Sequence, residues 1–230
     1  MKSPEELKRE ADELFDGIVG VELKNKDRMK IPPQEMPNQD PDARIENMNE
    51  VATGYFEHQV RVEAARCLNC KNAPCIEGCP VAIDIPGFVK AAEAGDFDKS
   101  VQIIKESSLL PAICGRVCPQ ETQCQATCTV GKALKDPLKS VSIGRIERYV
   151  ADLERESGKK SIPEIASETG KKVAVIGSGP AGITAAADLR KAGHQVTIFE
   201  AFHKPGGVMI YGIPEFRLPK AIVQEEFDTL

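Results

Sequence analysis

The chain has 230 residues, of which 41% are hydrophobic and 28% charged, a composition typical of a globular protein of one or two domains. Its 30 Lys and Arg against 35 Asp and Glu give a net charge of −5, which argues against a polybasic nucleic-acid surface. No apolar run approaches the roughly 20 residues of a membrane span, and the charged N-terminus lacks the apolar stretch of a secretory signal. We therefore expect a cytoplasmic protein with no nucleic-acid or membrane partner.

Helical periodicity dominates the first 155 residues. It predicts helices over residues 3–16, 55–66, 86–94 and 97–107, and one that starts near residue 140. Residues 17–50 contain four prolines, which exclude a helix or a central strand there. An extended arm over a surface and a disordered segment both remain open for this stretch. No strand pattern precedes residue 170, so the first domain is predicted to be mostly α-helical.

The pattern changes after a polar linker. A strand over residues 172–176, a glycine-rich turn, a helix over 180–192 and a strand over 195–200 together predict a parallel βαβ unit. The expected organisation is an N-terminal helix and arm (1–50), a helical domain (51–155), a linker (156–170) and the first part of a Rossmann-like domain (171–230). The predicted fold class is thus an α-helical domain followed by an α/β domain.

All eight cysteines lie between Cys67 and Cys128, and no secretory signal precedes them, so a metal site is favoured over disulfides. Their spacing is Cys67-x2-Cys70-x4-Cys75-x3-Cys79-Pro80 and Cys114-x3-Cys118-Pro119-x5-Cys124-x3-Cys128. Such close thiolates suit zinc or iron–sulfur clusters. The Cys-Pro ending favours clusters, because in two-cluster ferredoxins that cysteine binds the other cluster. This interleaving assigns one set to Cys67, Cys70, Cys75 and Cys128, and another to Cys79, Cys118 and Cys124.

A second motif follows the predicted strand at residues 172–176. The sequence Gly177-Ser178-Gly179-Pro180-Ala181-Gly182 fits the glycine pattern of dinucleotide-binding loops, and Glu200 ends the next strand. The glycines permit a tight turn and a close approach of pyrophosphate to the helix N-terminus. Glu200 can accept hydrogen bonds from a ribose diol and would repel a 2′-phosphate. The loop therefore suits FAD or NAD better than NADP.

Five segments together resemble the small-subunit family of NADPH-dependent glutamate synthase. They are CLNCKNAPCIEGCPV, ICGRVCPQETQCQATC, SIGRIERYV, VAVIGSGPAGITAAADL and FHKPGGVMIYGIPEFRLPK. The same module occurs in dihydropyrimidine dehydrogenase and in the large subunit of NADH-dependent ferredoxin:NADP oxidoreductase. The resemblance implies two [4Fe–4S] clusters, an FAD domain and an NADPH domain downstream of residue 230. We therefore expect these 230 residues to be a fragment that does not oxidise NADPH alone.

The resemblance also implies roles for individual residues. Gly206 and Gly207 match backbone that passes the flavin nucleotide, Arg217 an arginine that contacts FAD, and Val117 a position near the flavin. Glu147 matches the residue that completes the second cluster with an oxygen or amide ligand, so Cys114 is expected not to be a ligand. The alternatives are a surface charge for Arg217, core packing for Val117, and an exposed helix residue for Glu147.

The expected function is electron transfer from NADPH through FAD and the clusters to a glutamate synthase large subunit, which makes glutamate from glutamine and 2-oxoglutarate. No catalytic side chain is expected here, because the cofactors carry the chemistry. Other branches of the module remain open, namely ferredoxin:NADP, sulfide or dihydropyrimidine systems. Two further alternatives are a non-enzymatic electron-transfer protein and a zinc-binding regulatory module, which would be colourless.

Overall fold

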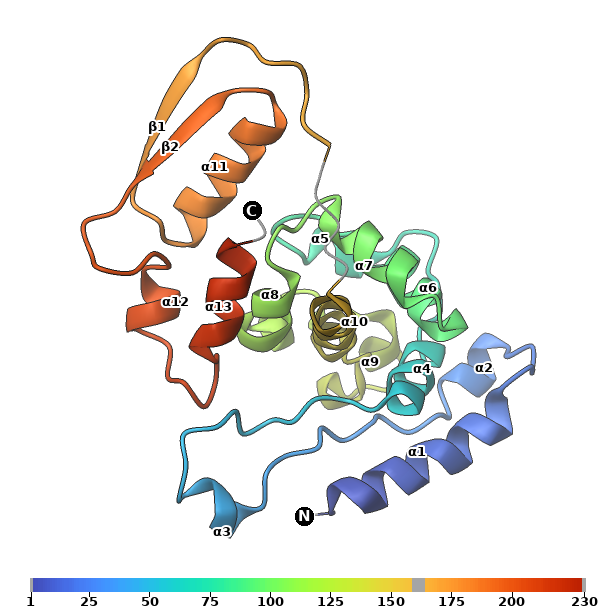
Figure 1. Ribbon diagram of the computed structural model, residues 1–230. Coiled ribbons are helices and arrows are strands. Elements are labelled where there is room, and N and C mark those ends of the chain that lie inside the picture. Colours follow the sequence, from blue (N-terminus) through green and yellow to red (C-terminus); the bar gives the residue numbers. More distant parts are fainter. Residues whose placement is uncertain (1, 159–163, 229–230) are drawn as a thin grey trace. The chain divides into compact units, whose positions relative to one another are not determined.

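The computed structural model describes residues 2–158 and 164–228, so part of the predicted linker lies outside the described residues (Figure 1). The described residues form two units, which are considered one at a time. The helical unit comprises residues 2–47 and 51–158, and the α/β unit comprises residues 48–50 and 164–228. No helix within these ranges is both long and apolar enough to cross a membrane.

The helical unit is built around one central helix, α10 (Ile143–Ser157), which packs against α4, α6, α7 and α8. Figure 1 shows α10 end-on, with these helices around it. The others are α1 (Pro4–Ile18), α2 (Asn25–Arg28), α3 (Pro41–Arg44), α4 (Glu57–Ala65), α5 (Pro74–Glu77), α6 (Ile85–Ala94), α7 (Phe97–Lys105), α8 (Pro111–Val117) and α9 (Thr129–Ala133), with 3-10 turns η1 (Gln120–Thr122) and η2 (Pro137–Lys139).

Local sequence signals explain where the longer helices begin and end. Ser3 and Glu6 form a capping box at the start of α1, in which each side chain accepts from the other residue's backbone N–H. The side chains of Asp84 and Asp96 cap α6 and α7. Gly95 ends α6 with a left-handed φ of 83°. The predicted helices at these positions are confirmed, with ends shifted by a few residues.

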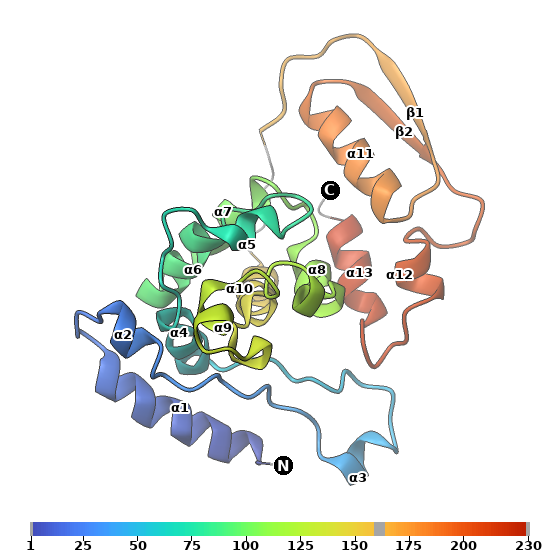
Figure 2. The ribbon, with the colours of Figure 1, turned by 180° about the vertical axis from the view of Figure 1, so that it is seen from behind.

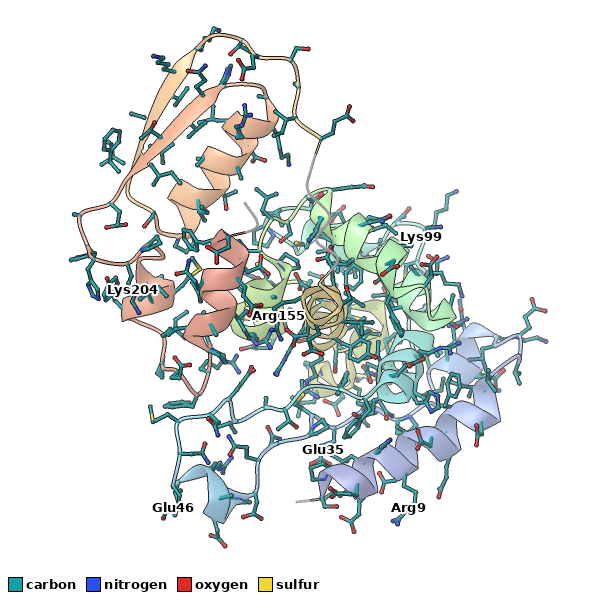
Figure 3. The ribbon with its side chains drawn as sticks, in the orientation of Figure 1. Arg9, Glu35, Glu46, Lys99, Arg155 and Lys204 are labelled. Atoms are coloured by element: carbon teal, nitrogen blue, oxygen red, sulfur yellow. The ribbon has the colours of Figure 1, made fainter. Side chains whose placement is uncertain are left out.

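The core of this unit lies on one face of α10. Ile146 is fully buried and Val150 almost so, and both belong to the same cluster as Phe88 of α6 and Ile104 of α7. Figure 3 shows side chains crowded around α10, whereas Arg9 on α1 and Lys99 on α7 project outward. The apolar periodicity that predicts α10 is therefore the packing face that holds the unit together.

The proline-rich arm is ordered and contains two short helices, so the expectation of no helix within residues 17–50 is wrong. Pro41 is the first residue of α3, a position that needs no N–H donor, and Asp40 caps it. The arm runs out to α3 and returns, and Asn38 pairs with Ala52 where the two passes lie side by side (Figure 2). Backbone hydrogen bonds join the two passes, from the N–H of Gln39 to Val51 and from the N–H of Thr53 to Pro37.

The α/β unit contains β1 (Lys172–Ile176), α11 (Pro180–Lys191), β2 (Gln195–Phe199), α12 (Val208–Tyr211) and α13 (Lys220–Phe227). The two strands are parallel, with Lys172 opposite Gln195 and Ile176 opposite Phe199. Helix α11 packs on the sheet, and exposed and half-buried residues alternate along both strands. The predicted fold class, a helical domain followed by a parallel βαβ unit, is confirmed.

Candidate metal centres and nucleotide loop

A first cavity gathers all four cysteines of the first predicted set: Cys67, Cys70, Cys75 and Cys128. Cys67 follows α4, Cys75 lies in the first turn of α5, and Cys128 immediately precedes α9. Asn69, with a left-handed φ of 48°, turns the chain between the first two cysteines. Burial raises the pKa of Cys67 to about 11 and that of Cys75 to about 12. Binding a metal here therefore releases protons.

A second cavity gathers Cys79, Cys118 and Cys124 with Glu147 and Cys114. Cys79 follows α5, Cys118 ends α8, and Glu147 projects from the central helix α10. The structure thus brings together every residue that the sequence assigned to the second set. Their role as ligands stays a prediction.

Glu147 is buried, with 5% of its surface exposed, and its Oε1 atom has no hydrogen-bond partner among the described residues. Burial, and then the nearby Cys118, raise the pKa of this carboxyl group to about 8. The alternative of an exposed helix residue is therefore wrong. An unpartnered buried carboxylate is costly, and a bound cation would compensate for it.

Cys114 lies one helical turn before Cys118, and both side chains line the second cavity. A hydrogen bond with Cys114 lowers the pKa of the Cys118 thiol. With Cys114 included, the second cavity holds one more donor than four-coordinate ligation requires.

The two cavities share part of their walls. Ile85 at the start of α6 and Ile143 at the start of α10 line both. No three His, Cys, Asp or Glu side chains within the described ranges converge closely enough to hold a single metal ion. The cysteines of each set line one cavity, and thiolates are the ligands that iron–sulfur clusters take. The residues present therefore fit two adjacent metal clusters.

A close crossing of α8 and α10 places Cys118 and Glu147 at the same cavity. A Cβ atom added to Gly115 would lie 2.6 Å from the backbone nitrogen of Arg148. We therefore expect Gly115→Ala to lower the free energy of unfolding by about 1–3 kcal/mol, because the two backbones must move apart.

Gly17→Ala in α1 is the matched control for this prediction. Gly17 has no atom within 4 Å of an added Cβ, so alanine should stabilise the helix slightly. Chemical denaturation of both variants measures the effect. Equal midpoints for the two variants would show that the helix crossing tolerates a side chain.

A buried ion pair holds the segments that carry the first cysteine and the central helix. Glu63 and Arg66, both fully buried, are 2.5 Å apart from Oε1 to the guanidinium. Glu63 also accepts from the backbone N–H of Gln34 and of Ser142, each at 2.8 Å. Arg66 donates to the backbone carbonyl of Ile31 and to those of Lys139 and Ser140.

Sequence reasoning missed this ion pair. The available signal was two opposite charges, three residues apart, among the apolar residues that immediately precede Cys67. Together they tie the arm, the end of α4 and the start of α10 at one point.

In the α/β unit, the glycine loop connects β1 to α11 as the motif predicts. Gly177 has a left-handed φ of 92°, which permits the turn. A Cβ at Gly182 would lie 2.1 Å from the carbonyl oxygen of Gly177, whereas Gly179 has no atom within 4 Å of such a position. Pro180 is the first residue of α11 and Ala181 follows it, so the helix N-terminus opens directly after Gly179.

Ser178 joins three segments around this loop. Its backbone N–H donates to Glu200 at 2.9 Å, and its hydroxyl also donates to Glu200. The same hydroxyl accepts from the backbone N–H of Gly206 at 3.1 Å. The bond from the Ser178 hydroxyl, followed by those from the backbone N–H groups of Phe202 and Ser178, lowers the pKa of Glu200 to about 2. Glu200 therefore orders the loop through Ser178, a contact that the sequence did not predict.

The remaining predicted residues lie at different places. Gly207 lies beside the loop, since a Cβ there would be 2.9 Å from Cα of Gly179. Arg217 is exposed, between α12 and α13. Val117 is half-buried on α8 and belongs to the helical unit. Contact of these three residues with a flavin stays a prediction.

Comparison with known proteins identifies both parts of the chain. Residues 44–159, half of the chain, match the family described as dihydropyrimidine dehydrogenase domain II, 4Fe-4S cluster. Residues 175–217 match the NAD(P)-binding Rossmann-like domain.

Three curated relatives cover most of the chain. The chain is 38% identical over 174 residues to the glutamate synthase [NADPH] small chain of Escherichia coli. This match covers 76% of the chain and 36% of that protein. It is 41% identical over 164 residues to the NAD-dependent dihydropyrimidine dehydrogenase subunit PreT of Escherichia coli, covering 71% and 39%. The glutamate synthase [NADPH] small chain of Azospirillum brasilense is 32% identical over 198 residues, covering 86% and 40%.

The matches span about two fifths of the length of these relatives. The two kinds of relative differ in the enzyme to which their names assign them. The chain belongs to the family described as dihydropyrimidine dehydrogenase domain II, 4Fe-4S cluster, which it shares with relatives such as the glutamate synthase small chain and the PreT subunit.

Proposed function

We propose that this chain carries electrons from an FAD, through two [4Fe–4S] clusters, to an acceptor on a larger partner subunit. The observation that carries the proposal is the pair of adjacent cavities, each lined by four predicted ligands. Because Ile85 and Ile143 line both cavities, groups bound there would be neighbours, as transfer of single electrons between them requires.

The residues of this chain would hold and separate the cofactors. Cys67, Cys70, Cys75 and Cys128 would hold one cluster, and Cys79, Cys118, Cys124 and Glu147 the other. The clusters supply one-electron chemistry, and FAD accepts electrons in pairs and releases them singly. Aliphatic side chains such as Ile85 and Ile143 line both cavities.

In the α/β unit, the glycine loop would bind the pyrophosphate of FAD. The N-terminus of α11 offers backbone N–H groups and a partial positive charge at the loop. Glu200, ionised at neutral pH and fixed by Ser178, would accept from the ribose hydroxyls and repel a 2′-phosphate. We therefore propose that NADPH binds elsewhere in the whole protein, in a domain downstream of residue 230.

For the whole protein we propose NADPH-dependent glutamate synthase activity with the glutamate synthase large subunit as partner. The similarity to two glutamate synthase small chains supports this choice. A dihydropyrimidine dehydrogenase-type subunit is the second candidate, and the 41% identity to PreT favours it. Co-purification of the whole protein with each type of large subunit distinguishes the two.

The chain reconstituted anaerobically with iron and sulfide is expected to hold about eight of each per molecule, because two four-iron clusters have that content. It should be brown, with broad absorbance near about 400 nm. Iron and acid-labile sulfide analysis makes the measurement, and a parallel preparation with zinc serves as the control. Stoichiometric zinc without sulfide in the native protein would contradict the proposal.

A further inference from the structure

Three side chains lie in a row at the wall of the second cavity. The Ser108 hydroxyl donates to the Cys114 sulfur at 3.9 Å, and Cys118 lies one helical turn after Cys114 and lines the same cavity. All three residues line the cavity, and Ser108 is only 5% exposed. The row therefore points from the protein interior toward a predicted cluster ligand.

The backbone fixes the geometry of this row. The Cys118 N–H donates to the Cys114 carbonyl at 3.1 Å, so the two side chains lie one turn apart on the same face of α8. The Cys114 carbonyl also accepts from the Gln120 side chain at 3.2 Å, which ties the turn after Cys118 to the helix. Cys114 is thus held beside Cys118 independently of any ligand role of its own.

The second cavity contains four other candidate ligands, so Cys114 is not needed as a ligand. Three cysteines supply thiolates, and the unpartnered, buried Oε1 of Glu147 supplies a fourth donor in the same cavity. A thiol that lies beside a ligand sulfur can donate a hydrogen bond to it. Cys114 is therefore suited to act on a ligand rather than as one.

We propose that Cys114 is a positioning residue that donates a hydrogen bond to the Cys118 sulfur and thereby sets the reduction potential of the cluster in the second cavity, with Ser108 orienting the thiol. This inference rests on the proposed function, because it requires that a cluster be bound. It assigns to the surplus cysteine a role distinct from ligation.

The expected direction follows from charge. A donor to a ligand sulfur draws electron density from the metal and stabilises the more negative, reduced state, so it raises the potential. Ser108 polarises the Cys114 thiol and strengthens its donation. Loss of the donor should therefore make the second cluster harder to reduce, with a smaller effect on the first.

The test is a potentiometric titration of the reconstituted full chain, followed by electron paramagnetic resonance. Cys114→Ala should lower the ratio of reduced to oxidised second cluster about tenfold at a fixed potential, which is about 59 mV for one electron. Cys114→Ser keeps a donor and should stay near the native potential. Ser108→Ala should shift in the same direction as Cys114→Ala, by less. Ser107→Ala, on the exposed neighbour, is the matched control and should not shift.

Three results would overturn the inference. Loss of the second cluster in Cys114→Ala, by iron analysis, would make Cys114 a ligand. An unchanged potential in that variant would show that Cys114 does not influence the reduction potential of the second cluster. Equal shifts in Cys114→Ala and Cys114→Ser would show that side-chain packing, rather than donation, sets the potential. Failure of the native chain to bind any cluster would instead overturn the proposed function and the inference with it.

Discussion

Glu147→Ala is expected to remove the second cluster and leave the first. Iron and sulfide should fall from about eight to about four per chain, because the alanine side chain offers no donor in a cavity that otherwise supplies three predicted thiolate ligands. Glu147→Gln keeps an oxygen donor of the same length and should retain both clusters, with a changed potential for one. Metal and sulfide analysis, with visible spectra of both variants, makes the comparison.

Cys114→Ala is the matched variant for this prediction. The simple count of eight cysteines would divide them into two sets of four and give Cys114 the ligand role. If Cys114→Ala loses half of the iron while Glu147→Ala keeps both clusters, the count is right and Glu147 is not a ligand.

Glu63→Ala is expected to destabilise the folded chain by about 3–5 kcal/mol, because it leaves the guanidinium of Arg66 buried without its carboxylate. The substitution also removes the acceptor of the backbone N–H groups of Gln34 and Ser142. Since Arg66 directly precedes Cys67, uptake of the first cluster should fall as well. Chemical denaturation of the metal-free chain measures the loss of stability.

Two variants control for this effect. Glu63→Gln keeps the acceptor oxygen without the charge and should lose less stability. Glu10→Ala removes an exposed ion pair with Lys2 and should leave the denaturation midpoint unchanged. A similar midpoint for Glu63→Ala and Glu10→Ala would mean that the buried pair contributes no more than an exposed one.

The sequence predicts those elements whose stability is local. The helices α1, α6, α7 and α10 have caps or apolar stripes that are visible in the sequence, and the βαβ unit has its glycine loop. Helices α5 and α9 were not predicted, because four or five residues are too few for a periodicity. Their positions depend on the packing around the cysteines.

The features of the candidate site likewise divide into those that local sequence predicts and those that depend on packing. Cysteine spacing is a local property, and it was sufficient to group the predicted cysteine ligands of each cavity, whereas Glu147 was predicted from the resemblance. Glu63 and Arg66 are close in sequence, but their burial and the bonds of Glu63 to Gln34 and Ser142 depend on segments distant in the chain. The contact between Ser178 and Glu200 also joins distant segments. The burial of Glu147 depends on how α10 packs against its neighbours. Apolar periodicity in the sequence indicates which face of α10 is buried, but not which residues that face contacts.

The shared wall of the two cavities couples the two sites. Hydrocarbon side chains screen charge poorly, so a charge placed in one cavity changes the energy of a charge in the other. Adding negative charge to one site therefore opposes adding it to the second, and the two should titrate as an anticooperative pair. Substitutions at Ile85 or Ile143 alter both sites at once. Leu68 lines the first cavity and Phe88 the second, which makes them the positions for varying one site at a time.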